Sequence, residues 1–423
     1  MRLLLALLSL TLADVAAERR SVPTYTIDLD LPPEERFKVL VRPGTGLNAT
    51  VWKFWTKYFV GDPLLKDALF ALVAARGHEA PELQAEISGM AAASGLPPAF
   101  VQGIQMLYEV QTLMVPIVNF SQPRLSSDGI GWEGANRTFH EPLPKKWEGL
   151  GRFPRAPFCT GIIATNQADG SVYHARNLDF FFTELMAELV YTGVFTRGGK
   201  ELYRAQMIAG YAGMITGMRR GPDGYALERN TRYADHWGGN KEMLAHLLSG
   251  RLLNGWVLRQ TLEACATYAC AVGRLTSSPY ASTEYAVISG VRKGTILARN
   301  PDGVAHTQTL GRHNYLQPPE YILITNFDFF FHDVRELFDP TGGHILGTPR
   351  RVAAQRILNA TLQAGGNLTG ELLFDTLNAK DVLADTIFQA IINVERDLWN
   401  VSIPDPASLP HATRSSREVT AAV

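Results

Sequence analysis

The residue with the clearest capacity for chemistry is Cys159. It is one of three cysteines in 423 residues, which are too few for a disulfide framework. The other two, Cys265 and Cys270, lie five residues apart in a segment read as helix, or about 140° apart around the axis. We therefore expect them to pack as small apolar side chains rather than to bridge each other. Cys159 then stands alone, and its thiolate form is a nucleophile.

The residues that follow Cys159 predict a β-hairpin. Two strand-forming segments flank an Asp-Gly turn centred on Ala168. In that register Cys159 lies opposite Arg176 or Asn177, with about 4.5–5.5 Å between the Cβ atoms. Arg176 and Asp179 then come near the thiol, where a guanidinium favours the thiolate and can bind a developing negative charge.

Taken on their own, these features are also common in proteins without catalytic activity. A lone cysteine at a strand start is usually structural, and an arginine–aspartate pair at a strand end is usually an ordinary ion pair. The residue pattern by itself therefore leaves the function open.

The elements that must position the hairpin divide the chain into five parts. They are a signal peptide at 1–17, a helical region at 18–117, a Pro/Gly-rich glycosylated loop at 118–158, a catalytic domain at 159–403 and a polar tail at 404–423. Strands are expected at 25–31, 160–165, 171–178, 202–208, 225–229, 285–289, 295–299 and 321–325, and further helices at 240–272 and 350–364. This order indicates an α+β fold with largely antiparallel sheets covered by helices.

The start of the chain predicts entry into the secretory pathway. An early arginine, an apolar run at 3–12 and small residues at 15–17 are typical of a signal peptide, and about ten apolar residues cannot span a bilayer of roughly 30 Å. Six Asn-x-Ser/Thr sequons agree with this route and give candidate glycosylation sites at Asn48, Asn119, Asn136, Asn359, Asn367 and Asn400. We expect the protein in the lysosome or outside the cell.

Charge and composition limit the partners. The net charge is −1, from 40 basic and 41 acidic residues, and without a long charged block nucleic-acid binding has no electrostatic basis. The histidines show no metal-ligand spacing, so we expect neither a metal nor another cofactor. Segment 51–60 is aromatic and lightly basic; core packing is the simpler interpretation, and an interfacial helix at a membrane surface is the alternative.

Several motifs resemble those of the acid ceramidase and N-acylethanolamine acid amidase family. The most specific are Phe-Cys-Thr-Gly-Ile-Ile-Ala at 158–164 and His-Ala-Arg-Asn-Leu-Asp-Phe at 174–180, which look like the nucleophile hairpin of that family. Further matching segments lie at 23–33, 210–217, 228–229, 325–328 and 350–351. The resemblance covers most of the chain in the correct order, apart from 118–157.

The resemblance implies an N-terminal-nucleophile fold, an αββα sandwich of two stacked antiparallel sheets between helices, preceded by a helical chain. It also implies a proenzyme cut between Phe158 and Cys159. The two resulting chains would stay associated as a non-covalent heterodimer, since no cysteine precedes Cys159. Matched residue by residue, Cys159 is the nucleophile, Arg176, Asp179 and Glu228 assist it, Asn326 lines the oxyanion site and Arg350 lies close by.

The implied reaction is hydrolysis of a fatty-acyl amide lipid, an N-acylethanolamine or ceramide or both. In the maturation step the thiol of Cys159 attacks the Phe158 carbonyl, and Glu228 donates a proton at acidic pH. Afterwards the free α-amino group, with a pKa of about 7.7–8.0 in simple peptides, moves protons for the thiol. The side-chain NH₂ of Asn326 is expected to stabilise the tetrahedral oxyanion.

The sequence departs from the family pattern in three places. Leu227 precedes Glu228 where a polar residue is usual, but neighbouring strand residues point to opposite faces, so the carboxylate need not be disturbed. Phe327 replaces a tyrosine beside Asn326. The stretch 118–157 resembles an insertion: a tolerated loop, a cover over the substrate entrance, or a segment trimmed after Arg152 or Arg155.

Three other functions remain to be weighed. A non-catalytic, lipid-binding paralogue is the main alternative from a different class, although every matched catalytic position is retained. An amidase of the same fold acting on bile-salt or penicillin-like amides is disfavoured by the N-terminal resemblance to acid ceramidase. A papain-like peptidase lacks the expected residues around Cys159.

Overall fold

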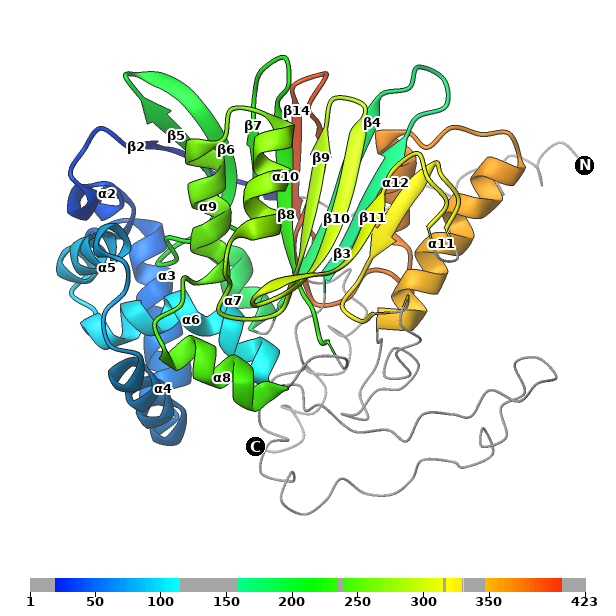
Figure 1. Ribbon diagram of the computed structural model, residues 1–423. Helices are drawn as coiled ribbons and strands as arrows, with labels where there is room; N and C mark the ends of the chain where they lie inside the picture. The colour runs from blue at the N-terminus through cyan, green and yellow to red at the C-terminus, as the bar shows by residue number, and fades with distance from the viewer. Residues whose placement is uncertain are drawn as a thin grey trace, which may run out of the picture.

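Two β-sheets form the centre of the molecule in a computed structural model of the chain (Figure 1). The structure describes residues 20–114, 159–180, 182–234, 239–314, 317–328, 330 and 347–404. The six-stranded sheet has the order β1 (Arg20–Ser21), β14 (Leu398–Ile403), β13 (Thr386–Asn393), β4 (Val172–Asp179), β3 (Cys159–Thr165) and β12 (Tyr321–Ile324). The eight-stranded sheet runs β11 (Gly303–Thr309), β10 (Lys293–Asn300), β9 (Glu284–Gly290), β8 (Tyr225–Thr231), β7 (Thr216–Arg219), β6 (Lys200–Ile208), β5 (Val190–Arg197) and β2 (Thr24–Asp28).

The two sheets pack face to face through their inner surfaces. Strand β3 contacts β8, and β4 contacts β9. Apolar side chains such as Ile163, Val287 and Ile322 fill one part of this interface and are fully buried. Because the outer faces are covered as well, β3 and β9 are buried along almost their whole length, and each carries a short continuous apolar run.

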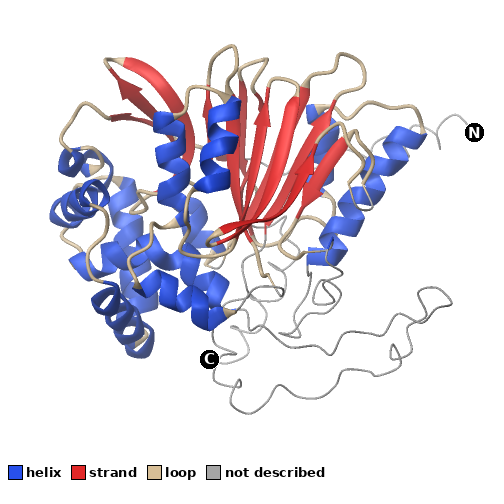
Figure 2. Ribbon diagram, in the orientation of Figure 1, coloured by secondary structure: helices blue, strands red, loops and turns tan. Residues whose placement is uncertain are grey.

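Helices cover both outer faces and complete four layers (Figure 2). Helices α11 (Gly347–Gln363) and α12 (Gly370–Asn378) pack on the six-stranded sheet, where Leu358 and Leu373 meet Ile162 in one apolar cluster. Helices α9 (Asn254–Ala264) and α10 (Tyr268–Ser277) cover the eight-stranded sheet. The expected α+β class is confirmed, and its layers follow the expected order of helix, sheet, sheet and helix.

The N-terminal segment forms a group of helices at one end of the sandwich (Figure 1). They are η1 (Pro33–Glu35), α2 (Lys38–Val41), α3 (Gly46–Trp55), the π-helix η2 (Thr56–Val60), α4 (Pro63–Arg76), α5 (Pro81–Ser94) and α6 (Pro98–Met114). Local signals set their starts: α4 and α5 begin with proline, and Asp62 accepts a hydrogen bond from Leu65 N at 3.2 Å. Strand β2 ends at Asp28, three residues before the expected end, and pairs in parallel with β5.

The helical stretch expected over 240–272 is divided into three helices, and the expectation that its cysteines do not pair is wrong. The chain forms α8 (Asn240–Leu248), α9 and α10, and Cys265 is disulfide-bonded to Cys270. Cys265 has extended backbone at the end of α9, and Thr267 caps the start of α10. The helical angle of separation therefore does not apply, and the Cα atoms lie 5.4 Å apart, within bridging range.

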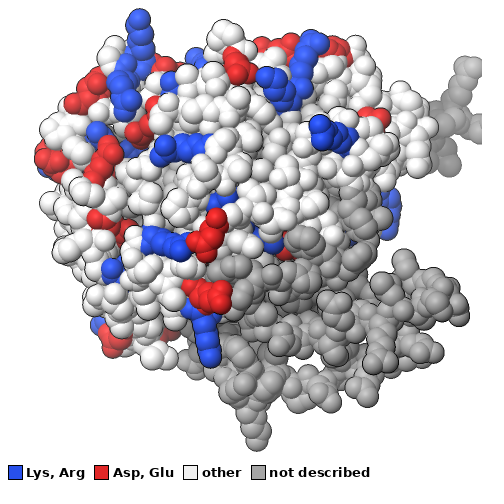
Figure 3. All heavy atoms as spheres, viewed as in Figure 1, with Lys and Arg blue, Asp and Glu red and all other residues white. Residues whose placement is uncertain are grey.

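None of the described helices is long and apolar enough to cross a membrane. On the face drawn in Figure 3, basic and acidic side chains are interspersed rather than gathered in a block of one sign. This distribution agrees with the near-zero net charge of the sequence.

Several features expected from the sequence lie outside the described residues. They are the signal peptide at 1–17, the stretch 118–157, Phe158, Asn119, Asn136, Arg152, Arg155 and the tail beyond Pro404. Among the other sequons, Asn367 and Asn400 are exposed, whereas Asn359 is half-buried and accepts a hydrogen bond from Tyr321 at 2.8 Å. Asn48 is only 8% exposed, which disfavours a glycan at this position.

Candidate active site

Cys159 opens β3, the first strand of the hairpin. It pairs with Leu178 on β4, and Gly161 pairs with Arg176. Cys159 was expected opposite Arg176 or Asn177, so the observed partner is one residue farther along β4. The turn covers 166–171, and its centre lies between Ala168 and Asp169 rather than on Ala168. Cys159 and Arg176 consequently occupy diagonal positions on one face of the hairpin, within reach of a long side chain.

That face points between the two sheets and carries a chain of buried polar groups. Arg176 Nη1 donates to Thr216 Oγ1 at 2.6 Å, and its Nε lies 3.8 Å from Glu228 Oε1. Glu228 Oε2 lies 2.7 Å from His174 Nε2. The other ring nitrogen of His174 lies 3.0 Å from Ser289 Oγ. Both sheets thus contribute to one row of buried polar groups, joined by hydrogen bonds and by the Arg176–Glu228 ion pair.

Gly161 allows the Glu228 carboxylate to approach the backbone of β3. A Cβ atom at this glycine would lie 2.7 Å from Glu228 Oε1 and 3.1 Å from Asn230 Nδ2. No real Cβ atom tolerates the shorter contact, so a side chain here would displace the carboxylate. Leu227 points to the opposite face of β8, into the apolar core, so the departure at this position leaves the carboxylate in place.

The opposite face of the hairpin holds Asp179 under helix α11. Arg350 Nη1 donates to Cys159 O at 2.9 Å, to Thr160 Oγ1 at 2.9 Å and to Asp179 Oδ2 at 3.1 Å. Thr386 donates to the second oxygen, Asp179 Oδ1, at 2.5 Å. Burial raises the pKa of Asp179 to about 6, although the charge of Arg350 opposes the shift.

Asn326 joins the backbone nitrogen of Cys159 to the arginine. Its Oδ1 accepts from Cys159 N at 2.8 Å and from Arg350 Nη2 at 2.8 Å. Two donors converge on this atom, which fixes it as the amide oxygen. The Nδ2 group donates to Thr231 O at 2.8 Å, so one of its two hydrogens is engaged there.

The thiol of Cys159 is fully buried. Its sulfur lies 3.4 Å from the hydroxyl of Tyr108, which comes from α6 in the N-terminal segment. Burial raises the pKa of the thiol, while the charge of Arg176 and the hydrogen bond with Tyr108 pull it down. In this arrangement the neutral thiol is favoured, and nucleophilic attack needs a base to accept its proton.

The structure therefore brings together all six residues that the resemblance places at the site, Cys159, Arg176, Asp179, Glu228, Asn326 and Arg350. The sequence interpretation missed Tyr108, and it gave His174 no role. The available signal for Tyr108 was the unusual number of polar residues along α6, where Gln105, Glu109 and Gln111 are buried.

Those polar residues hold the N-terminal helices against the rest of the chain. Gln105 donates to Gly210 O at 2.6 Å and accepts from Ala212 N at 2.8 Å. Farther from the thiol, Glu86 on α5 forms a two-pronged ion pair with Arg259 on α9, at 2.5 and 2.7 Å. These contacts are non-covalent and buried.

Among the residues described by the structure, no group of three or more His, Cys, Asp or Glu side chains could hold a metal ion. The side chains around Cys159 offer a thiol, two carboxylates, two guanidiniums and an amide, a set suited to acyl transfer through sulfur.

Comparison with known proteins found amidases and ceramidases that are similar to this chain. No protein-family model matches the chain. The N-acylethanolamine-hydrolyzing acid amidase of Caenorhabditis elegans is 28% identical over 306 residues, which are 72% of this chain and 74% of that protein. The acid ceramidase of Homo sapiens is 24% identical over 418 residues, which are 92% of this chain and 88% of that protein.

A solved structure of the Caenorhabditis elegans N-acylethanolamine-hydrolyzing acid amidase ortholog is also similar, with a TM-score of 0.46 and 27% identity. The match covers 55% of this chain and 92% of the solved chain. The resemblance seen in the sequence motifs is confirmed by the curated relatives: the chain is a relative of the N-acylethanolamine-hydrolyzing acid amidases and the acid ceramidases.

Proposed function

We propose that the chain is an autoprocessed cysteine amidase that hydrolyses fatty-acyl amide lipids, N-acylethanolamines or ceramide or both, to a free fatty acid and an amine. The observation that carries the proposal is the environment of Cys159. This residue starts a strand, and its backbone nitrogen donates to Asn326. Its thiol shares one face of the hairpin with Arg176, which pairs with Glu228 of the other sheet. The amidase relatives support the same chemistry.

The first reaction is cleavage of the chain before Cys159. The sulfur attacks the carbonyl carbon of Phe158, the peptide C–N bond breaks, and the nitrogen takes a proton as a thioester forms. Glu228, hydrogen-bonded to His174 at 2.7 Å, is the group we assign to proton transfer. Water then hydrolyses the thioester, which leaves a carboxylate on Phe158 and a free thiol and amine on Cys159.

The second reaction is amide hydrolysis by the processed enzyme. The Cys159 nitrogen donates to Asn326 Oδ1 at 2.8 Å in the uncut chain; as the free α-amine after cleavage, it accepts the thiol proton while the sulfur attacks the substrate carbonyl. The hydrogen of Asn326 Nδ2 that Thr231 does not engage is the donor assigned to the oxyanion, supported by the charge of Arg176. The α-ammonium protonates the leaving amine, and water releases the fatty acid from the acyl-enzyme.

The two products of cleavage stay together as a non-covalent heterodimer in this proposal. Tyr108 on the N-terminal side contacts the nucleophile directly, and the Glu86–Arg259 ion pair is fully buried. Loss of either piece would expose these charged groups and remove one wall of the site.

A surface on the N-terminal helices is suited to contact with the membrane or micelle that carries the substrate. Trp52, Val60 and Leu64 are 37%, 51% and 79% exposed, and Lys53 and Lys57 lie among them. The other side of the same segment packs in the core, as expected, and the membrane contact is proposed for the exposed side alone. Sedimentation with anionic vesicles, comparing wild type with Val60→Ser/Leu64→Ser, tests this contact; equal binding would contradict it.

Localisation in the secretory pathway, ending in the lysosome or outside the cell, remains part of the proposal. The Cys265–Cys270 disulfide fits an oxidising compartment, and the exposed sequons Asn367 and Asn400 are accessible to glycosylation. A mobility shift after glycosidase treatment of protein from eukaryotic cells checks it.

The decisive experiment is maturation of the expressed protein at acidic and neutral pH, beside a Cys159→Ala control. We expect wild type to give a fragment whose first residue is Cys159, and the control to stay intact. Release of fatty acid from an N-acylethanolamine and from a ceramide then assigns the substrate. An intact chain that binds lipid without hydrolysing it would instead establish the non-catalytic paralogue.

A further inference from the structure

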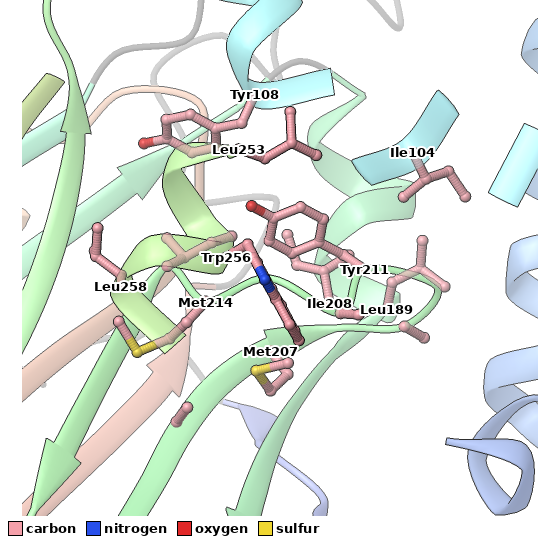
Figure 4. Packing of buried hydrophobic residues seen from close by; sticks show 14 of the residues in the cluster. Ile104, Tyr108, Leu189, Met207, Ile208, Tyr211, Met214, Leu253, Trp256 and Leu258 are labelled. Carbon is pink, nitrogen blue, oxygen red and sulfur yellow. The ribbon is translucent and has the colours of Figure 1, made fainter. Parts of the chain in front are cut away.

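The hydroxyl of Tyr108 is the polar group that reaches the thiol from the N-terminal side of the chain. It lies 3.4 Å from Cys159 Sγ and 3.2 Å from the carbonyl oxygen of Arg229. The tyrosine is 3% exposed, so water does not compete for this position. In Figure 4 the ring hangs from α6 above Leu253, and its hydroxyl points away from the labelled apolar side chains.

We propose that Tyr108 is a further catalytic residue, which donates its hydroxyl proton in a hydrogen bond to the Cys159 thiolate and so stabilises the nucleophile. The proposal rests on the proposed function, in which Cys159 attacks the amide. It adds a group from the N-terminal piece to a set of residues that otherwise comes from the chain after the cleavage site.

The hydroxyl hydrogen of Tyr108 has two possible acceptors, the sulfur of Cys159 and the carbonyl oxygen of Arg229, and can therefore take two positions. With a neutral thiol, S–H donates to the tyrosine oxygen while the tyrosine donates to the Arg229 carbonyl. With a thiolate, the tyrosine O–H turns to the sulfur, where a charged acceptor makes the stronger bond. Burial raises the pKa of Tyr108 well above its ordinary value, so the hydroxyl keeps its proton and remains a donor.

The ring is held in place for this task. The guanidinium of Arg229 lies 3.8 Å from the ring centroid of Tyr108. Arg229 is itself fixed by Glu109 at 3.0 Å, Glu284 at 2.7 Å and Tyr211 at 3.1 Å. The hydroxyl therefore needs only a rotation of its hydrogen to serve the thiolate, with no movement of heavy atoms.

The test is Tyr108→Phe, which removes one oxygen and keeps the ring under Arg229. Cys159 is the one free cysteine of the chain, since the other two are bridged, so alkylation by iodoacetamide reports on it alone. We expect the pH midpoint of alkylation of the processed enzyme to rise by about one to two units, and kcat at fixed pH to fall about 10- to 100-fold with KM unchanged.

Tyr280→Phe is the matched control. Tyr280 is also buried, its hydroxyl donates to Leu275 O at 3.4 Å, and Arg299 lies 4.5 Å from its ring. We expect this variant to keep the wild-type alkylation midpoint and kcat, and melting temperatures report whether both variants fold.

The outcomes separate this inference from the proposed function. A wild type that hydrolyses the amide, with an unchanged alkylation midpoint in folded Tyr108→Phe, overturns the role of Tyr108 and leaves the amidase standing. A shifted midpoint in a protein without hydrolytic activity supports the thiol–tyrosine pairing and refutes the amidase. Equal shifts in both tyrosine variants also overturn the assignment, because they would show a general effect of packing.

Discussion

Replacement of Arg350 by methionine should expose how strongly this buried guanidinium supports the nucleophile strand. The side chain is fully buried and makes hydrogen bonds to Cys159 O, Thr160 Oγ1, Asp179 Oδ2 and Asn326 Oδ1. Methionine fills a similar volume but leaves the Asp179 carboxylate with the Thr386 hydroxyl as its remaining hydrogen-bond donor among those described above. Loss of one partner of a buried ion pair costs about 3–5 kcal/mol, because an uncompensated charge remains.

This cost depends on pH in a defined direction. The folded-state pKa of Asp179, about 6, lies above the ordinary value of 3.8, so its contribution to stability is full below 3.8 and is lost as pH rises through about 6. Removal of Arg350 raises that pKa further. We therefore expect the variant to be destabilised by about 3–5 kcal/mol at neutral pH and by less at mildly acidic pH, where the carboxylate is protonated.

Urea unfolding in a Cys159→Ala background measures this, since under the proposed function that substitution prevents self-cleavage. The informative control is Arg350→Met combined with Asp179→Asn. Asp179→Asn removes the charge of the carboxylate. In that background Arg350→Met should lower the free energy of unfolding by roughly half as much as it does in the presence of Asp179, which is a coupling of about 1–3 kcal/mol between the two residues. Equal costs in both backgrounds and at both pH values would refute the assignment of the energy to this ion pair.

Three further predictions concern residues away from the sulfur. Gly161→Ala places a methyl group 2.7 Å from Glu228 Oε1, so it should destabilise the fold by about 1–3 kcal/mol and slow self-cleavage. Urea unfolding measures the first effect, and the rate at which fragments appear measures the second. Glu86→Gln removes the carboxylate that the N-terminal helices present to Arg259, which keeps, among the described carboxylates, only Glu263 at 2.9 Å. The change should favour separation of the two pieces expected after cleavage, measured by size-exclusion chromatography in moderate urea, whereas exposed Glu371→Gln should not. Burial raises the pKa of Glu284 to about 7 from an ordinary 4.5. The free energy of unfolding should therefore rise by up to roughly 3 kcal/mol as pH falls from above 7 towards 4.5, and Glu284→Gln should reduce this pH dependence.

Local sequence signals predicted the hairpin at the site, but they do not contain the strand pairings between segments far apart in the chain. The strands on either side of the Asp-Gly turn are β-rich and adjacent in sequence, so their pairing follows from the turn. The register was wrong by one residue because the turn has six residues, and composition does not fix that number. Six strands were not predicted: β1, β5, β7, β11, β13 and β14. Strands β1 and β7 are short, and β13 carries polar residues such as Gln389, which pairs with Asn177 on the distant strand β4.

The site itself depends on contacts that no local pattern contains. Asn326 reaches the nitrogen of Cys159 across 167 residues, and Arg350 reaches its carbonyl across 191. Only the match to family motifs predicted that they would meet. Tyr108 had no such match, and a tyrosine on a helix is ordinarily interpreted as core packing.

Strand pairing also determines what a cut before Cys159 can separate. The N-terminal segment supplies β1, the edge strand of the six-stranded sheet, and β2, the edge strand of the eight-stranded sheet. A gene fragment that encodes only residues 159–423 would leave β5 and β14 as open edges, a template for pairing between copies. We expect such a fragment to aggregate unless residues 1–158 are co-expressed, in the manner of a split protein reassembled from its halves.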